Sequence, residues 1–375
     1  MKVGLITYHS AYNFGSVMQA YATQEVIRNI IDNCEVINYR TAEQKRVYAV
    51  FKWDKGTRFI RSLAKNILII PSYHNRVKRA KKYEETITKL FNLSEEVTEP
   101  QDVYSMWGQY DMIVSGSDQI WNKHSNELEN VSWKYMKPYL LVGYQGKKIS
   151  YASSLTNMTD DEIEYILPDI QAFDFISFRE ENTARKVRDE FNVENYCVLD
   201  PTFLLTKAQW INKLSLERQA GSDYILFYVL CRRSGIKSMM SVVKEIGIKT
   251  GKKVKMISPL ATLSSEQCVE VLEEVDPIDF MNLIYNASMV VTDSYHGTIL
   301  SVNLGKDVYS VCKGFPSDFR KIDVLNRLGM SDRIIQNPEE LLVKEYEPID
   351  YAVVNNRIQL LREESMDYLV NALRS

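Results

Sequence analysis

The chain has 375 residues, of which 45% are hydrophobic and 25% charged, and its formal net charge is −3. This composition excludes a disordered chain, a collagen-like chain and a disulfide scaffold, and the length predicts two domains. No run reaches the ~18–20 apolar residues that span a bilayer, and the opening MKVGLITYHS lacks the apolar region of a signal peptide. Five scattered cysteines without CxxC spacing predict reduced thiols and no metal site. We therefore expect a cytoplasmic protein.

The first half of the chain alternates apolar runs with segments of helical periodicity, which is typical of a parallel sheet covered by helices. Strands are predicted at 2–8, 36–39, 112–115, 149–152, 175–178 and 197–199. Helices are predicted near 16–31, 160–172 and 180–191. The stretch from Pro201 to Ser222 is irregular, and we place a domain boundary there.

A second alternating series follows this boundary. Its strands are predicted at 224–230, 254–257, 289–292 and 308–311. Its helices are predicted near 235–250, 266–274, 278–286 and 296–303, with a last amphipathic helix at 353–373. The fold class is therefore α/β, with two Rossmann-like domains at 1–205 and 222–345. The C-terminal segment 351–375 is expected to pack back near the first domain.

Ligands of open parallel sheets bind beyond the carboxyl ends of strands, and in two-domain proteins these ends usually face a shared cleft. In the first domain, helix starts and strand ends carry polar residues suited to anions. The predicted substrate contacts are Asn13, Gly15, Ser16, Ser117, Asp118, Gln119 and Ser153, with Arg179 after the strand at 175–178. The alternatives are that Ser16 and Asp118 cap helices and that Arg179 pairs with Glu180 or Glu181.

Two strand-end loops of the second domain carry further candidates. Arg232 and Arg233 follow the strand at 224–230 and would cradle a phosphate, or else they are ordinary exposed loop residues. His296 lies where a strand ends and a helix begins, beside Gly297. A helix start favours a neutral imidazole that exchanges a proton, although a single histidine is more often structural. The position at a strand end favours function for His296.

Several segments together resemble the polysaccharide pyruvyl transferase family. They are NFGSVMQAYATQ, YDMIVSGSDQIWN, ISYASS, ISFREENTARKV, VLDPTFLL, VVTDSYHGTILSVNLGKDVYSV and DFRKIDVLNRLGMSDR, in this order. The resemblance implies a GT-B-like fold and transfer of pyruvate from phosphoenolpyruvate onto two sugar hydroxyls as a cyclic ketal, without a cofactor or metal. It also implies a hexose acceptor, such as galactose, in a lipid-linked repeat unit of an exopolysaccharide or capsule.

The same resemblance implies roles for individual residues. Arg179 falls on a family arginine assigned to donor binding, and His296 falls on the histidine of an Arg-x-His-Gly motif. This chain has Ser294 where that motif has its arginine, so one cation of the donor site is missing from its usual place. Arg320 or Lys313, after the last strand, is the expected replacement. The other predicted contacts around His296 are Tyr295, Gly297 and Thr298.

Three other functions are compatible with parts of the pattern. A GT-B glycosyltransferase would use the Arg232 and Arg233 loop to hold the diphosphate of a nucleotide sugar. A non-catalytic binding protein could share the same scaffold. Nucleic-acid binding is suggested by a local excess of positive charge, but no nucleic-acid-binding module accompanies it, so we expect no nucleic-acid partner.

The excess of positive charge lies at residues 45–82, which we call the basic window. It holds twelve Lys/Arg and one acidic residue, a charge of +11, so the rest of the chain carries −14. Over 57–70 the apolar residues fall near one helical face and the cations toward another, as in an interfacial helix. We expect peripheral docking on the anionic inner membrane face. Alternatively, the apolar face packs on the first domain, or the cations steer the diphosphate of the lipid carrier.

Overall fold

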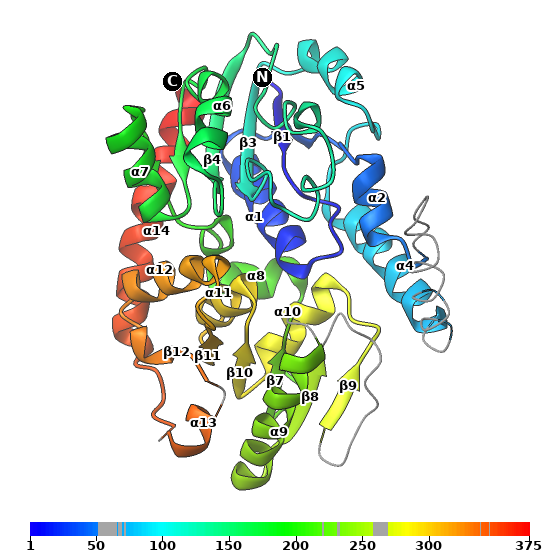
Figure 1. Cartoon of the computed structure of the whole chain (residues 1–375), viewed down its shortest axis with the longest axis vertical. Helices are drawn as coiled ribbons and strands as arrows, with labels where there is room; N and C mark the ends of the chain where they lie inside the picture. Colours follow the sequence, from blue (N-terminus) through cyan, green and yellow to red (C-terminus); the bar gives the residue numbers. More distant parts are fainter. Residues whose placement is uncertain are drawn as a thin grey trace. The chain divides into compact units, whose positions relative to one another are not determined.

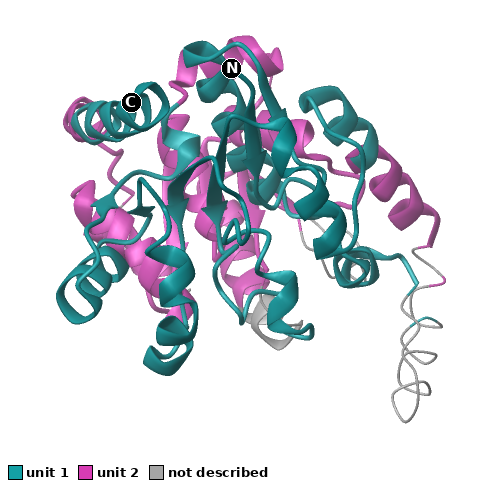
Figure 2. Ribbon diagram, turned by 90° about the horizontal axis from the view of Figure 1, so that it is seen from above, with its two compact units in different colours: residues 1–68, 84–204, 359–375 teal, residues 69–83, 205–358 magenta. Residues whose placement is uncertain are grey.

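The structure is a computed structural model in which the chain divides into two compact units (Figure 2). Unit 1 comprises residues 1–68, 84–204 and 359–375, and unit 2 comprises residues 69–83 and 205–358. The described residues are 1–51, 66, 70, 73–219, 221–230, 233–257, 269–337, 339–344 and 346–375, without the side chains of 233–238. The helix expected over 57–70, apart from residues 66 and 70, and the candidate Arg232 lie outside the described residues.

Unit 1 is built on a six-stranded parallel sheet in the order β2-β1-β3-β4-β5-β6. Figure 1 labels its neighbouring strands β1, β3 and β4. Its strands are β1 (Val3–Ile6), β2 (Cys34–Val36), β3 (Met112–Asp118), β4 (Lys147–Ser153), β5 (Ser177–Phe178) and β6 (Tyr196–Cys197). Its helices are α1 (Phe14–Ile30), α2 (Ala42–Tyr48), α5 (Pro100–Ser105), α6 (Asp160–Ile170), α7 (Glu181–Phe191) and the 3₁₀ turns η3 (Trp107–Gln109), η4 (Trp133–Tyr135) and η5 (Pro201–Phe203). Every residue of β1 and β3 is buried, because helices cover both faces of a parallel sheet.

Local sequence signals explain where the helices of unit 1 begin. The Asn13 side chain accepts a hydrogen bond from the Gly15 amide and starts α1 directly after β1. Thr159 and Glu162 form a capping box that starts α6. The Trp121 ring lies edge-on to Phe173 at 5.1 Å between ring centroids, deep in the core. The Asn13 cap thus places the start of α1 directly after the carboxyl end of β1.

Unit 2 is built on a second six-stranded parallel sheet, in the order β12-β11-β10-β7-β8-β9. Its strands are β7 (Tyr224–Tyr228), β8 (Lys253–Ile257), β9 (Val269–Leu272), β10 (Met289–Thr292), β11 (Asp307–Val311) and β12 (Ile334–Ile335). Its helices are α8 (Lys207–Leu214), α9 (Arg233–Thr250), α10 (Pro277–Asn286), α11 (Tyr295–Asn303), α12 (Phe319–Arg327), α13 (Glu340–Val343) and the 3₁₀ turns η6 (Pro316–Asp318) and η7 (Ser331–Arg333). The predicted fold class, two doubly wound α/β domains with parallel sheets, is confirmed.

Two predicted segments of unit 2 differ from the structure. Residues 269–272, expected within a helix at 266–274, form the edge strand β9, in which Val269 pairs with Val254 of β8. The valines favour a strand, and pairing with β8 outweighs the helix propensity of the glutamates between and after them. The stretch 201–221, expected to be irregular, contains α8, which starts with a capping box of Thr206 and Gln209.

Two long helices contain residues of both units. In α4 (Tyr73–Leu90), residues 73–83 belong to unit 2 and residues 84–90 to unit 1. In α14 (Tyr351–Arg374), residues 359–374 belong to unit 1, where the Tyr368 hydroxyl donates to the Ser150 carbonyl at 2.8 Å. Part of the basic window therefore groups with unit 2, although the sequence pattern placed the window in the first domain. Among the described helices, none is long and apolar enough to cross a membrane.

Candidate functional site

Three strand ends of unit 2 come together around the start of α11. Asp293 follows β10, and its carboxylate accepts a hydrogen bond of 2.7 Å from the Leu230 amide after β7. The Thr292 hydroxyl accepts from the Ser294 amide at 3.0 Å, and the Ser294 side chain caps α11 by accepting from the Gly297 amide at 3.2 Å. The residue that replaces the family arginine is therefore the N-cap of α11.

His296 is the second residue of α11 and is buried. Its ring centroid lies 5.1 Å from that of Tyr295, and the Arg320 guanidinium lies 5.3 Å from the Tyr295 ring centroid. The structure thus brings an imidazole, a phenol and a cation to one helix start. Backbone N–H groups at such a start favour a bound anion, so these groups together suit an anionic ligand.

Gly297 needs to be glycine because of its neighbours. A Cβ atom at this position would lie 2.7 Å from the Thr292 hydroxyl and 3.0 Å from Cδ1 of Tyr228. The absence of a side chain therefore lets the start of α11 approach the ends of β10 and β7 closely. Thr298, also predicted as a substrate contact, is fully buried, and its hydroxyl shares a hydrogen bond of 2.9 Å with Ser310 of β11. This contact holds α11 against the sheet.

A buried lysine that the sequence analysis missed joins two of these strand ends. The Lys321 ammonium donates to the Asp293 carbonyl at 2.8 Å and to the Val311 carbonyl at 2.6 Å, and it pairs with Asp318 at 2.8 Å. Its place in the amphipathic segment DFRKID, on the buried face of α12, was the available signal. The predicted Lys313 is exposed, with its amide donating to Asp318 at 2.8 Å. Arg233 begins α9, and its side chain is not described.

In unit 1, the end of β3 is the centre of a buried polar network. The Asp118 carboxylate accepts from the Ser16 hydroxyl at 2.6 Å and from the Gln119 amide at 2.9 Å. Asp118 has a positive φ of 76°, and two residues earlier a Cβ atom on Gly116 would collide with the Tyr151 carbonyl. The backbone of β3 thus packs closely against β4 just before Asp118.

Arg179 lies among carboxylates of its own unit. Its side chain is 1% exposed, its Nη1 lies 3.0 Å from Asp200, and its Nε lies 3.1 Å from Glu180. The third nitrogen, Nη2, lies 3.9 Å from Asp118. The pairing with Glu180 that we weighed as an alternative is therefore present, together with two further carboxylates. A contact between Arg179 and the donor stays a prediction.

The remaining predicted residues of unit 1 have structural partners. The Ser117 hydroxyl donates to the Ala152 carbonyl at 2.7 Å, and the Ser153 hydroxyl donates to the Ser115 carbonyl at 3.4 Å. Both serines are fully buried between β3 and β4. Asn13 caps α1, and the Gln119 side-chain oxygen accepts from the Asn122 amide group at 2.7 Å. These contacts hold the loops at the sheet edge in place.

Glu127, in the long loop after β3, is a buried carboxyl group that no sequence motif indicated. It accepts a hydrogen bond from the Tyr48 hydroxyl. Burial raises the pKa of Glu127 to about 7, and the negative charge of Asp118 contributes to the rise. Burial raises the pKa of the Tyr8 and Tyr139 phenols, and the negative charge of Glu127 adds to the rise of each.

The raised pKa of Glu127 predicts a pH-dependent stability. Because the folded pKa of about 7 exceeds the ordinary value of 4.5, the folded state holds the proton more tightly. Its contribution is present below about pH 4.5 and is lost as the pH rises through about 7, a change of about 3 kcal/mol. The free energy of unfolding, measured in urea at about pH 5 and about pH 8, should therefore fall less between these two pH values for Glu127→Gln than for the wild type. Glu129→Gln, at an exposed position, is the control, and an unchanged pH slope for Glu127→Gln would contradict the assignment.

Part of the basic window is already engaged by acidic residues of the chain. Lys45 contacts Glu96 at 2.5 Å, and Arg46 contacts Glu43 at 2.7 Å, both within unit 1. These two cations of the window therefore have acidic partners in their own unit. Within unit 2, two cations of α4 form further pairs, Lys78 with Glu274 and Lys82 with Asp279, each at 3.3 Å.

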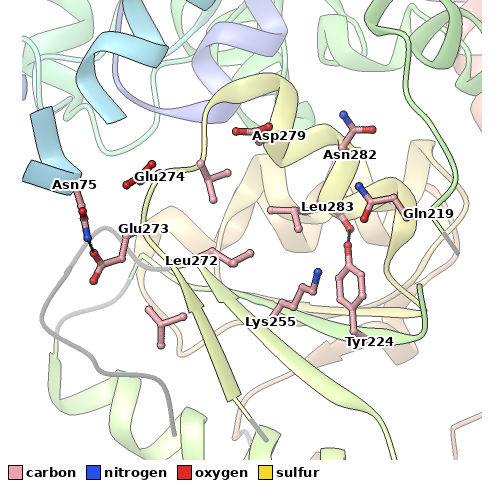
Figure 3. A pocket seen from close by; sticks show the side chains of 12 residues that line it. Asn75, Gln219, Tyr224, Lys255, Leu272, Glu273, Glu274, Asp279, Asn282 and Leu283 are labelled. Carbon is pink, nitrogen blue, oxygen red and sulfur yellow. Dashed lines mark hydrogen bonds between the residues drawn. The ribbon is translucent and has the colours of Figure 1, made fainter. Parts of the chain in front are cut away.

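Unit 2 also has a pocket of about 640 Å³ between α10 and the strands β7 to β9 (Figure 3). The Tyr224 hydroxyl donates to the Leu283 carbonyl at 2.7 Å, and the Lys255 ammonium lies 4.5 Å from the Tyr224 ring centroid. Glu273 and Asp279 line its rim. None of the site residues predicted from the sequence lines this pocket. Within the described residues, no group of three or more His, Cys, Asp or Glu is arranged to hold a metal ion.

Two parallel-sheet units of this kind define the GT-B fold of glycosyltransferases and related epimerases. The structure is similar to the UDP-GlcNAc 2-epimerase of Methanocaldococcus jannaschii, with a TM-score of 0.54, 12% identity and coverage of 97% of this chain and 100% of that chain. It is also similar to MnaA of S. aureus, with a TM-score of 0.50, 10% identity and coverage of 99% and 91%. No curated protein matches the chain.

The family model for polysaccharide pyruvyl transferase matches residues 13–311. The chain therefore belongs to the polysaccharide pyruvyl transferase family and is a transferase.

Proposed function

We propose that the protein transfers pyruvate from phosphoenolpyruvate to a sugar and forms a cyclic ketal. The observation that carries the proposal is the convergence of His296, Tyr295 and Arg320 at the start of α11. The start of α11 lies within the matched family region, and Arg320 follows the end of that region. Phosphoenolpyruvate carries a phosphate and a carboxylate, and a helix start beside a guanidinium suits both. In this proposal Arg320 takes the place of the arginine that Ser294 replaces.

The reaction requires one addition and one displacement at carbon 2 of the donor. In the addition, one sugar hydroxyl attacks carbon 2 and loses its proton to a general base while carbon 3 takes up a proton from a general acid, so the enol double bond is replaced by a methyl group and a new C–O bond. The second hydroxyl then displaces phosphate from carbon 2 and loses its proton. We assign His296 to proton donation at carbon 3 or to hydrogen bonding with the leaving phosphate.

A GT-B glycosyltransferase acting on a nucleotide sugar is the second candidate, because the structure resembles an epimerase solved with UDP-GlcNAc and UDP. The two reactions release different products. Pyruvyl transfer releases inorganic phosphate from phosphoenolpyruvate, whereas glycosyl transfer releases a nucleoside diphosphate. Purified protein incubated with lipid-linked sugar extracts and either donor should release phosphate from phosphoenolpyruvate. Release of nucleoside diphosphate alone would favour the second candidate.

We further propose that the acceptor is a hexose such as galactose in a lipid-linked repeat unit, and that the basic window docks on an anionic membrane. Four of the described cations of the window, Lys45, Arg46, Lys78 and Lys82, are in ion pairs, so the test uses residues 52–65 of the window. A variant with K52Q, K55Q, R58Q, R61Q and K65Q should co-sediment less than wild type with anionic vesicles at low salt. Equal sedimentation of the two proteins would contradict membrane docking.

A further inference from the structure

We propose that the pocket between α10 and the strands β7 to β9, which we call the α10 pocket, binds a neutral saccharide at a place separate from the start of α11. Its volume of about 640 Å³ falls within the range of about 300–1,000 Å³ that is usual for small-molecule sites. The residues that line it lie outside the motifs that resemble the family. The inference rests on the proposed function only in the choice of a sugar as its ligand.

The floor of the α10 pocket holds a half-buried lysine without an acidic partner. The Lys255 side chain extends from β8 toward α10, and its ammonium lies 4.5 Å from the Tyr224 ring centroid (Figure 3). Glu270 lies opposite Lys255 in the register of β8 and β9, but the two form no ion pair. Within the part of the chain that the structure describes, this ammonium has no hydrogen-bond acceptor. Its N–H donors can therefore bind a ligand.

On the α10 wall, Asn282 offers further donors in a fixed orientation. Its Oδ1 atom accepts a hydrogen bond of 3.3 Å from the Glu217 amide. The Asn286 side chain donates to the Glu217 carbonyl and accepts from the Gln219 amide, each at 2.9 Å, so the segment 217–219 is held on α10. The Nδ2 group of Asn282 has no acceptor among the described residues. The orientation of this group is thus set before any ligand arrives.

The rim of the α10 pocket provides acceptors, because it carries carboxylates that α4 holds in place. The Asn75 amide donates to the Glu273 carboxylate. The Oδ2 atom of Asp279 lies 3.3 Å from the Lys82 ammonium and accepts from the Asp276 amide at 3.2 Å. Its Oδ1 atom accepts no hydrogen bond from any described residue. Both carboxylates line the pocket and can accept hydrogen bonds from a ligand.

This combination of donors, acceptors and aliphatic side chains suits a saccharide. Sugar hydroxyls donate and accept at the same time, so they match the donors of Lys255 and Asn282 and the acceptors of the rim. The C–H groups of a sugar ring match the aliphatic part of the lining, which consists of Val271, Leu272, Val275 and Leu283.

Other classes of small molecule fit the α10 pocket less well. An anionic ligand would meet the carboxylates of Glu273, Glu274 and Asp279, and a cationic ligand would meet the Lys255 ammonium. A nucleobase would need an open aromatic face, but the Tyr224 ring is buried and has the Lys255 ammonium beside it. A neutral, hydroxyl-rich ligand avoids all of these conflicts.

The test measures binding of neutral tetrasaccharides of galactose and of glucose to full-length protein by calorimetry. Wild type should bind at least one of them saturably. Lys255→Met and Asn282→Asp should each weaken that binding by about 10-fold, because each removes hydrogen-bond donors. Asn282→Asp keeps an oxygen for the Glu217 amide. The control is Lys253→Met, at an exposed position of β8 outside the lining, which should bind as wild type does.

Two further measurements locate the sugar and define its charge. His296→Ala should bind the tetrasaccharide as wild type does, because His296 does not line the α10 pocket. A tetrasaccharide of galacturonic acid should bind more weakly than the neutral sugars, since the rim is acidic. Binding that is lost in His296→Ala but kept in Lys255→Met and Asn282→Asp would overturn the inference. Tighter binding of the acidic sugar would also overturn it.

The outcomes separate this inference from the proposed function. If wild type releases phosphate from phosphoenolpyruvate but binds neither neutral tetrasaccharide, the inference is overturned and the proposed function stands. If the sugar binds and both pocket variants weaken it, but phosphoenolpyruvate releases no phosphate, the inference stands and the proposed function fails. If Asn282→Asp does not fold, Lys255→Met decides, because the Lys255 ammonium makes no hydrogen bond within the described chain.

Discussion

Replacing His296 with alanine is expected to lower kcat for phosphate release from phosphoenolpyruvate by ~10²–10⁴, the loss typical of removing a general acid. The imidazole is held at the start of α11 next to Tyr295, and the cap of Ser294 fixes the first turn of this helix. A proton donor at this point acts on the donor itself, so kcat should fall more than KM rises. Steady-state phosphate release over a range of phosphoenolpyruvate concentrations measures both constants.

The matched control for this variant is His124→Ala. The His124 ring contacts Glu162 at 2.9 Å on the exposed surface of unit 1, so its removal should leave kcat unchanged. Comparing the two histidine variants separates a role at α11 from a general effect of losing an imidazole. Turnover of His296→Ala close to that of wild type would contradict the assignment of His296 to the reaction.

Replacing Arg179 with methionine is expected to lower the free energy of unfolding by about 3–5 kcal/mol. The guanidinium is 1% exposed and lies within 4 Å of three carboxylates, those of Asp118, Glu180 and Asp200. Methionine keeps much of the volume but removes the positive charge, so buried carboxylates lose their partner. Urea unfolding followed by circular dichroism measures the loss.

Arg188→Met is the control for the loss of an arginine. Arg188 lies 3.6 Å from Asp189, and its side chain is 47% exposed, so this variant should stay within about 0.5 kcal/mol of wild type. If Arg179→Met were as stable as the wild type, the network of Arg179 with its three carboxylates would not stabilise unit 1. Its stability change also bears on function, because a destabilised Arg179 variant would lose activity without any contact between Arg179 and the donor.

The fold was largely predictable because most strands are short apolar runs rich in β-branched residues, which can be recognised in the sequence alone. Met289–Thr292 was predicted with the bounds that the structure has, because its run is short, rich in β-branched residues and followed directly by the polar Asp293. Residues 269–272 were not predicted, because acidic residues surround the valines and the strand depends on its pairing with β8. The helix α4 was also missed, because its many charged residues leave little apolar periodicity to detect. Its contacts come from Glu273, Glu274 and Asp279, which are far away in sequence.

The places of the candidate residues in the fold were easier to predict than their contacts, and their roles stay predictions. The strand-end rule led to His296 and to Asp118 directly. The partners of Arg179 were partly predictable, because Glu180 is adjacent whereas Asp118 and Asp200 reach it only through the sheet. Lys321 and Glu127 lie in segments without a strand-end motif, and their surroundings arise from tertiary packing.

The central claim is that carbon from phosphoenolpyruvate ends up in a ketal on a sugar, through chemistry at the start of α11. Mass spectrometry of the lipid-linked sugar product, after incubation with carbon-labelled phosphoenolpyruvate, tests it most directly. Wild type should yield a sugar whose mass rises by one labelled pyruvyl group with loss of water, and His296→Ala should yield almost none. A product without the label, formed instead with release of a nucleoside diphosphate from a nucleotide sugar, would contradict the account.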